Sequence, residues 1–248
     1  MDKQIYQQIY DLELRHWWFQ GRRKIIFDCI RRTIGSEPRT VLDIGCGTGL
    51  NAKLLQQLGA KVTGLESSDV AIAQAKERFP ELNIIKGEFP QVTISDRFRV
   101  ITLFDVLEHF EDDLAALQGV YSLLEDGGYA IIAVPAFSFL WSEHDELAHH
   151  RRRYTKSLLQ KRLEESGFSI VRASYFNMLF FPAIFAVRIF QKFLGSRRGH
   201  ADFFMMPEPV NAVFAFLFGL ERFLLRFMNL PFGVSIIVIA RKHSNVYS

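Results

Sequence analysis

The sequence predicts a doubly wound α/β fold, in which helices cover both faces of a mostly parallel sheet of seven strands. Short apolar segments of strand length alternate with segments of helix length, which is the pattern of repeated strand–helix units. The first apolar segment also leads directly into a glycine-rich loop and a helix that begins near Leu50. The expected strands are 41–44, 61–66, 82–87, 98–104, 129–134, 168–176 and 237–242.

The loop VLDIGCGTG, residues 41–49, indicates which kind of ligand this fold binds. Gly45, Gly47 and Gly49 allow unusual backbone dihedrals and let a ligand approach closely. A glycine turn between a strand and a helix is typical of a nucleotide-binding crevice. The spacing is G-x-G-x-G with Asp43 two residues before it, whereas a dinucleotide site has G-x-G-x-x-G. This spacing disfavours a nucleotide-dependent oxidoreductase, which stays an alternative.

The loop and its acid resemble the first motif, D-x-G-x-G-x-G, of the class I S-adenosylmethionine (SAM)-dependent methyltransferases. The resemblance implies a Rossmann-like sheet whose last strand lies antiparallel between the fifth and the sixth. It also implies SAM as the cofactor and S-adenosylhomocysteine as its product. Trp17 and Trp18, ahead of the glycine motif, resemble small-molecule methyltransferases, including the ubiquinone O-methyltransferases.

Residues at successive strand ends are expected to hold the cofactor, because parallel strands end over one crevice. Glu66 follows Gly45 by 21 residues, close to the spacing at which an acid binds ribose hydroxyls. The resemblance implies that Glu88 takes the adenine amino group while Phe89 flanks the ring. The full set expected to bind the cofactor is Trp18, Arg22, Asp43, Gly45, Cys46, Gly47, Gly49, Glu66, Ser67, Gly87, Glu88, Phe89, Phe104, Asp105 and Val106.

His109 and His144 are the expected catalytic residues. An imidazole suits removal of a proton from an acceptor hydroxyl near neutral pH, although His109 could instead be a hydrogen-bonded residue at a helix start. The favoured prediction includes no metal ion. The alternative is a divalent ion, because Asp105, Glu108 and His109 resemble the acid-x-x-Glu-His metal site of some O-methyltransferases.

The segment 135–155 directly follows the fifth strand, so it is expected to face the acceptor. His144 and Asp145 are predicted to form a pair that acts as a base or positions the acceptor. Arg151 and Arg153 are instead expected in a solvated loop. The residues expected to bind the acceptor are Trp17, Asp145, His149, Arg152 and Tyr154.

The chain is expected to divide into three segments. Residues 1–36 form a helical lid whose aromatic cluster packs either on the domain edge or over the cofactor, with Arg22 or Arg23 holding the methionine carboxylate of SAM. Residues 37–175 together with 233–243 form the SAM-binding domain. Residues 176–232 form a helical insertion before the last strand.

The insertion holds 14 of the 24 phenylalanines of the chain. It is predicted to form two helices, both far more apolar than a surface helix requires, joined by a linker that is basic and then aromatic. Three interpretations stay open. These are a dimer interface or a hairpin buried on the sheet, a hydrophobic pocket for the acceptor, and an anchor at a membrane surface.

Composition bounds the partners and the compartment. The formal net charge of +3 is too small to indicate nucleic acid as a partner. The two cysteines, Cys29 and Cys46, cannot form a disulfide framework, which indicates a reducing compartment. The polar start of the chain has no apolar signal segment, so we expect a cytoplasmic protein, peripheral on the inner face of the cell membrane if the insertion binds lipid.

Together these features predict an enzyme that moves a methyl group from SAM to a small apolar or lipid-linked acceptor. An oxygen is the favoured acceptor atom, ahead of carbon or nitrogen. A SAM-binding subunit without catalysis is the alternative, and a homodimer is one expected use of the insertion.

Overall fold

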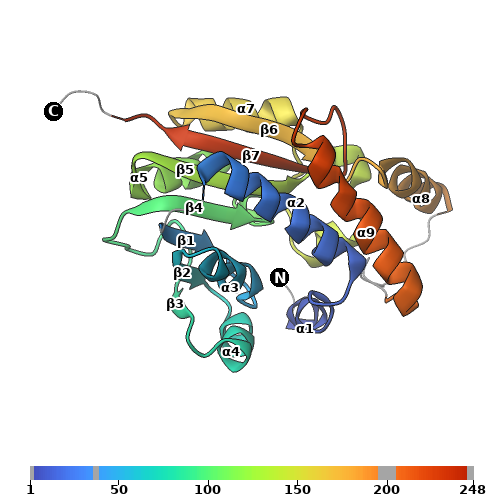
Figure 1. The fold of residues 1–248 in the computed structure, drawn as a ribbon, viewed down its shortest axis with the longest axis horizontal. Coiled ribbons are helices and arrows are strands. Elements are labelled where there is room, and N and C mark those ends of the chain that lie inside the picture. The colour runs from blue at the N-terminus through green and yellow to red at the C-terminus, as the bar shows by residue number, and fades with distance from the viewer. Residues whose placement is uncertain (1–2, 36–38, 195–204, 245–248) are drawn as a thin grey trace.

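The computed structural model describes residues 3–35, 39–194 and 205–244, which form a seven-stranded sheet flanked by helices (Figure 1). The strands are β1 (Thr40–Ile44), β2 (Lys61–Glu66), β3 (Asn83–Lys86), β4 (Phe98–Phe104), β5 (Leu124–Pro135), β6 (Phe168–Phe176) and β7 (Ser235–Lys242). Their order in the sheet is β3-β2-β1-β4-β5-β7-β6. Strand β7 runs antiparallel between β5 and β6, as the resemblance implied. The predicted fold class is confirmed.

Helices cover both faces of this sheet (Figure 1). The α-helices are α1 (Lys3–Leu12), α2 (Trp17–Ile34), α3 (Leu50–Gln57), α4 (Asp69–Arg78), α5 (Asp113–Leu123), α6 (Glu143–Leu147), α7 (Lys156–Glu165), α8 (Phe181–Leu194) and α9 (Glu208–Leu224), and the 3₁₀ turns are η1 (Leu107–His109) and η2 (Ser138–Leu140). Ser68, Asp112 and Thr155 begin α4, α5 and α7, and each side chain accepts a hydrogen bond from a backbone N–H three residues on.

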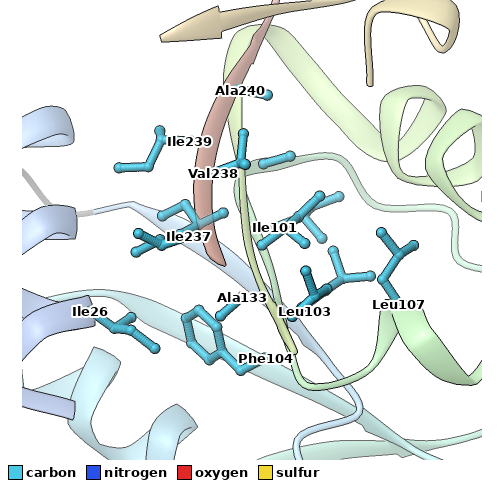
Figure 2. Close-up of a cluster of buried hydrophobic side chains, with 14 of the residues drawn as sticks. Ile26, Ile101, Leu103, Phe104, Leu107, Ala133, Ile237, Val238, Ile239 and Ala240 are labelled. Carbon is cyan, nitrogen blue, oxygen red and sulfur yellow. The ribbon is translucent and has the colours of Figure 1, made fainter. Parts of the chain in front are cut away.

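The core lies on both faces of the sheet because successive side chains of a strand point to opposite faces. In Figure 2, Ile237 and Ile239 of β7 point to the side on which Ile26 of α2 lies. Val238 and Ala240 point to the other side, and all four of these β7 residues are buried. Burial on both faces explains why this strand is an unbroken apolar run.

Strand β5 begins earlier than the predicted start at residue 129. Leu124 pairs with Phe98, and the register then shifts so that Tyr129 pairs with Val100. Gly127 takes a φ of +71° within this irregular stretch. Gly127 and Gly128 therefore lie at a bulge inside the strand.

The insertion leaves the sheet at the end of β6 and returns at the start of β7. Its described part contains α8 and α9, and α9 packs along α2 (Figure 1). Of the basic and aromatic linker predicted at 195–209, residues 195–204 lie outside the described residues, and α9 already begins at Glu208. Within the described ranges, no helix combines the length and the apolarity needed to cross a membrane. The division of the chain into three segments stays a prediction.

Candidate functional site

A cavity of about 450 Å³ lies where β1, β2 and β4 end at one edge of the sheet. Its lining comes from the loops after these strands and from helices α1 and α2, which cover it. A cavity of this size at the carboxyl ends of parallel strands is the usual place and volume for a small-molecule site. The predicted crevice is therefore a real cavity.

The glycine loop forms the floor of this cavity. Gly45, Gly47 and Gly49 have φ values of +66°, +54° and +80°, a region that glycine adopts without penalty. Gly45, Cys46 and Gly47 line the cavity. A Cβ on Gly45 would lie 2.5 Å from a methyl group of Val106, whereas one on Gly47 would project into open space. Gly49 instead packs against Leu82, outside the lining.

Glu66 ends β2 and lines the cavity beside the loop. One carboxylate oxygen accepts from the backbone N–H of Gly47 at 2.9 Å, and the other accepts from those of Ser67 and Ser68, also at 2.9 Å. These bonds fix the carboxylate at the cavity wall with the remaining lone pairs available for ligand hydroxyls. Ser67 lines the cavity as well.

Asp43 lies beneath the loop and does not line the cavity. Thr102 of β4 donates a hydrogen bond to one of its carboxyl oxygens, and the other oxygen has no described partner. Burial, with a further contribution from the charge of Glu66, raises the pKa of Asp43 to about 7. The predicted role of Asp43 in binding the cofactor stays a prediction.

The ends of β3 and β4 supply the opposite wall. Gly87, Glu88 and Phe89 line the cavity, and the Phe89 ring is buried against Phe110 with 6.0 Å between centroids. All three residues predicted after β4, namely Phe104, Asp105 and Val106, also line it. Asp105 has a φ of +57°, an uncommon conformation for a residue with a side chain and one that clusters at functional sites.

Arg22 reaches the cavity from α2. Its guanidinium lies 2.7 Å from the carboxylate of Asp105 and packs over the rings of Trp18 and Phe104. Arg22 is buried, although the Asp105 side chain is partly exposed to the cavity. Trp18 holds Arg22 without lining the cavity itself. Arg23 lines the cavity, and burial lowers its pKa to about 10.

His109 is the predicted catalytic histidine that the structure places in the cavity wall. Burial, together with the neighbouring His150, lowers the pKa of His109 to about 4. The rings of the two histidines lie 4.8 Å apart between centroids. His109 is therefore neutral near pH 7 and able to accept a proton.

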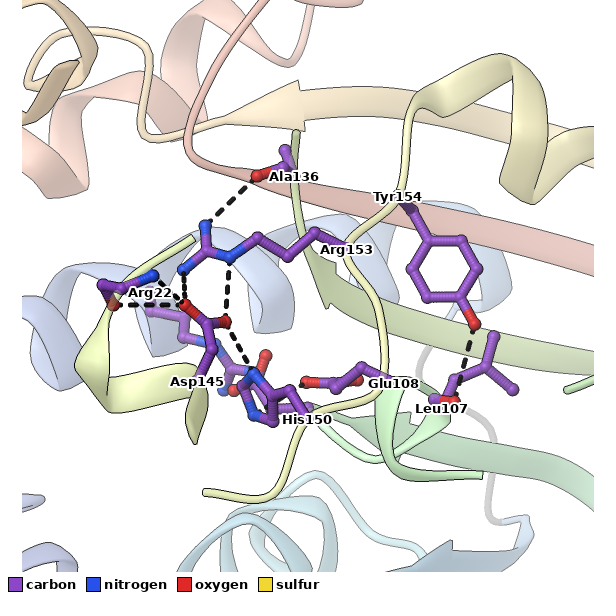
Figure 3. Close-up of polar contacts among 10 residues, drawn as sticks. Arg22, Leu107, Glu108, Ala136, Asp145, His150, Arg153 and Tyr154 are labelled. Atoms are coloured by element: carbon purple, nitrogen blue, oxygen red, sulfur yellow. Dashed lines mark hydrogen bonds and ion pairs between the residues drawn. The ribbon is translucent and has the colours of Figure 1, made fainter. Parts of the chain in front are cut away.

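Behind His109 lies a buried polar network (Figure 3). Asp145 bonds to Nδ1 of His150 at 2.8 Å and to Nε of Arg153 at 2.8 Å. Burial would raise the pKa of Asp145, but His150 and Arg153 hold that pKa below its ordinary value. The predicted solvated position of Arg153 is wrong, because this side chain is buried and paired.

The pairing of His144 with Asp145 stays a prediction. Asp145 takes His150 and Arg153 as its partners, and the ring of His144 lies 5.9 Å from that of His150 between centroids. His144 does not line the cavity.

Glu108 is fully buried at the inner end of this network, near His150 (Figure 3). Neither of its carboxyl oxygens has a hydrogen-bond partner among the described residues, and Nε2 of His150 lies 3.8 Å away. Burial and the charge of Asp105 raise the pKa of Glu108 well above its ordinary value. Glu108, His109 and His150 bring potential metal ligands within 4.8 Å of one another, whereas Asp105 of the alternative set pairs with Arg22.

The residues predicted to bind the acceptor take different places. His149 lines the cavity with a φ of +58°. Tyr154 is fully buried and donates a hydrogen bond to Asp113 at 2.9 Å, and Arg152 pairs with the same carboxylate at 3.1 Å. Trp17 packs against phenylalanines of the insertion instead of the cavity. Of this set, only His149 lines the described cavity.

Sequence reasoning missed a clasp between α1 and the glycine loop. Glu13, which follows α1, is buried in the cavity lining and accepts a hydrogen bond from the hydroxyl of Thr48 at 2.6 Å. Arg78 of α4 forms an ion pair with Glu13. The only available signal was an acid within the predicted lid, because its two partners lie 35 and 65 residues away in the sequence.

The chain is similar to known proteins in sequence and in fold. Residues 17–173, more than half of the chain, match the model of a methyltransferase domain family. A probable S-adenosylmethionine-dependent methyltransferase of Mycolicibacterium smegmatis is 26% identical over 158 residues, which cover 62% of this chain and 60% of that protein. A ubiquinone biosynthesis O-methyltransferase of Alkalilimnicola ehrlichii is 29% identical over 140 residues, covering 50% of this chain and 56% of that protein. These matches thus span less than two-thirds of either relative.

A solved structure of Haemonchus contortus phosphoethanolamine N-methyltransferase 2, in complex with SAM, has a similar fold with a TM-score of 0.60 at 16% identity. The match covers 90% of this chain and 53% of that one, and at this identity it shows the fold alone. The family match ends before the insertion. On this match over more than half of its length, the chain belongs to the methyltransferase domain family, which confirms the predicted class I SAM-dependent methyltransferase and its cofactor, SAM.

Proposed function

We propose that this protein transfers a methyl group from SAM to an oxygen of a small apolar or lipid-linked molecule. The observation that carries the proposal is a single cavity lined by the glycine loop, by Glu66 and by His109, which is neutral. A cofactor site and a base in the same cavity are what methyl transfer to a hydroxyl requires. One relative is a ubiquinone biosynthesis O-methyltransferase, and its transfer to an oxygen supports this acceptor class.

The residues of the cavity fit SAM on their own chemistry. The open space in front of Gly47 admits a ligand against the backbone, and Glu66 stands beside it to accept hydrogen bonds from ribose hydroxyls. Glu88 and Phe89 offer an acceptor and an apolar wall for the adenine. The pair Arg22 and Asp105 offers opposite charges to the carboxylate and ammonium groups of the methionine moiety.

When bound, SAM supplies an electrophilic methyl group on a cationic sulfonium. The chain's own residues then align the acceptor, exclude water and hold a proton. Helices α1 and α2 close over the cavity, and the buried clasp of Glu13 with Thr48 keeps the first of them against the glycine loop. His109 lines the cavity and is neutral, so it is placed to accept the proton of the acceptor hydroxyl, with a lowered pKa that makes it a weaker base than an ordinary imidazole.

The state of Glu108 favours a second candidate mechanism. A fully buried carboxyl group without a hydrogen-bond partner is stable only if it is protonated or binds a cation. The potential ligand atoms of His109 and His150 lie close to this carboxyl group. Asp145 bonds to Nδ1 of His150 and so orients the ring. A histidine that binds a metal through one ring nitrogen commonly bonds to a carboxylate through the other in this way. A divalent ion at Glu108, His109 and His150 would polarise the acceptor hydroxyl.

Formation of S-adenosylhomocysteine with a panel of apolar phenols and lipid-linked hydroxyl compounds tests the proposal. With an accepted compound, His109→Ala is expected to lower kcat by about 100- to 10,000-fold, because the base is lost, while SAM binding measured by calorimetry stays unchanged. His144→Ala is the matched control and should retain activity, since His144 does not line the cavity.

A chelator separates the two candidate mechanisms. Activity that is unchanged by chelation supports His109 as the base, whereas loss that magnesium restores supports the ion. If wild-type protein binds SAM but yields no S-adenosylhomocysteine with any compound, the result would favour the alternative function, a SAM-binding subunit without catalysis.

A further inference from the structure

Helix α9 exposes an apolar stripe along the side that faces away from α2. We call this set the outer apolar surface, and it consists of Val213, Phe216, Leu220, Phe223, Leu224 and Phe227. These residues recur at helical spacing, so they share one face. Phe216 is 61% exposed and Phe227, just beyond the helix, is 89% exposed. A continuous exposed apolar face of this kind marks an interaction surface.

Two polar residues of α9, Asn211 and Glu221, point inward instead. Asn211 accepts a hydrogen bond from the backbone N–H of Trp17 at 2.8 Å and donates one to the carbonyl of Arg15. Glu221 accepts from the backbone N–H groups of Asn177 and Leu179 at 2.7 and 2.8 Å. Both side chains are buried. Asn211 and Glu221 thus anchor α9 to the domain on the same side as the buried ring of Phe218, whereas Phe216 and Phe223 are exposed.

A second group of aromatic side chains is exposed outside α9. Phe185 of α8 and Phe139 of η2 contact each other with 5.7 Å between ring centroids, and both are exposed. Phe181 joins them to Phe232, the residue before the turn into β7, at 5.3 Å. Three elements far apart in the sequence therefore present phenylalanine at the same part of the surface.

The charge of this region is positive. In the described residues from 177 to 234 the acids are Glu208, at the start of α9, and the buried Glu221. Arg222 and Arg226 lie beside the outer apolar surface with their guanidinium groups over the ring of Phe223, at 4.8 and 4.5 Å. Arginine beside exposed aromatic rings suits the boundary between anionic headgroups and acyl chains.

The insertion leaves the sheet at the carboxyl end of β6, which runs parallel to β5 and so ends at the same edge as the cavity strands. Figure 1 shows α8 and α9 together at that end of the molecule. No described residue of the insertion lines the cavity, so its apolar side chains are not the wall of that acceptor site. A partner that binds to the insertion would therefore lie beside the cavity.

We propose that the outer apolar surface docks the protein on a membrane with anionic headgroups. A second copy of this chain is the less favourable partner. A symmetric dimer pairs one surface with itself, which would bring the Arg222 side chains of both copies to one interface; Arg226 is already paired with Asp28 of α2. A bilayer needs no matching shape, and anionic lipids complement the arginines. This docking does not depend on the reaction proposed above.

Flotation of the full chain with lipid vesicles tests this proposal. Wild-type protein is expected to float with vesicles of equimolar phosphatidylcholine and phosphatidylglycerol, and less with phosphatidylcholine alone. The double variant Phe216→Gln, Phe227→Gln should reduce the bound-to-free ratio by about tenfold or more, because both rings are exposed and lose their burial in lipid. The matched control is the double variant Leu58→Gln, Leu158→Gln. These two leucines are exposed, the first just after α3 and the second on α7, and the variant should float as wild type does.

Wild-type protein that stays in the soluble fraction with both kinds of vesicle would overturn the proposal. So would equal flotation of the wild type and the double variant. A concentration-dependent dimer in sedimentation that the double variant abolishes, without flotation, would assign the surface to a second copy. Calorimetric binding of SAM, measured on every variant, should not change, so the outcome for docking stays separate from that for methyl transfer.

Discussion

The carboxyl group of Asp43 belongs to the glycine motif by sequence, yet it serves the fold in this structure. It bonds to Thr102 across two adjacent strands and lies beneath the ligand cavity. Because burial raises its pKa to about 7, the folded protein binds the Asp43 proton more tightly than the unfolded chain does. The stability from this tighter binding is complete below the unfolded pKa and is lost as pH rises through about 7.

Asp43→Asn should therefore change the pH dependence of stability. From about pH 4 to about pH 8, the free energy of unfolding of the SAM-free variant should gain about 2–4 kcal/mol relative to wild type. Denaturant unfolding at the two pH values measures this. Parallel pH dependence in both proteins would show that Asp43 titrates normally. Asp69→Asn, at an exposed carboxylate, is the control and should leave the pH difference unchanged.

Between elements, the crossing of α2 and α9 shows how the insertion is joined to the domain. Gly21 of α2 lies against Phe218 of α9, and a Cβ on Gly21 would lie 2.4 Å from that ring. Gly219 of α9 lies against the flexible side chain of Lys24 instead, at 3.0 Å. Asp28 of α2 pairs with Arg226 at 3.1 Å. Close backbone approach and this ion pair together hold the helix whose outer face is apolar.

Gly21→Ala and Gly219→Ala form a matched pair, because alanine gains about 1 kcal/mol of helix propensity over glycine in both. At Gly21 the buried ring of Phe218 must shift, so this variant should lose about 1–3 kcal/mol in the free energy of unfolding. Gly219→Ala should be neutral or more stable, since Lys24 can move. Equal effects of the two substitutions would show that α2 and α9 are not closely packed.

At the scale of the whole molecule, features that depend on local pattern were predictable. The place of the last strand followed from the resemblance, and Glu66 was expected at the cavity because the ends of parallel strands meet one crevice. His150 was missed because its partners Glu108 and Asp145 come together only when the loop after β5 folds back over η1. The buried face of α9 could not be predicted either, because a helix that is apolar on nearly all sides gives no pattern that distinguishes the buried face from the exposed one.

Calorimetric titration of the full chain with SAM tests the central claim most directly. Wild-type protein should bind SAM, and Glu66→Ala should bind it about 10- to 100-fold more weakly, because the variant loses charge-assisted hydrogen bonds to the ribose. Glu81→Ala, at an exposed acid outside the cavity, should bind as wild type. No binding to wild-type protein, or equal affinity in Glu66→Ala, would contradict the assignment of this cavity to SAM.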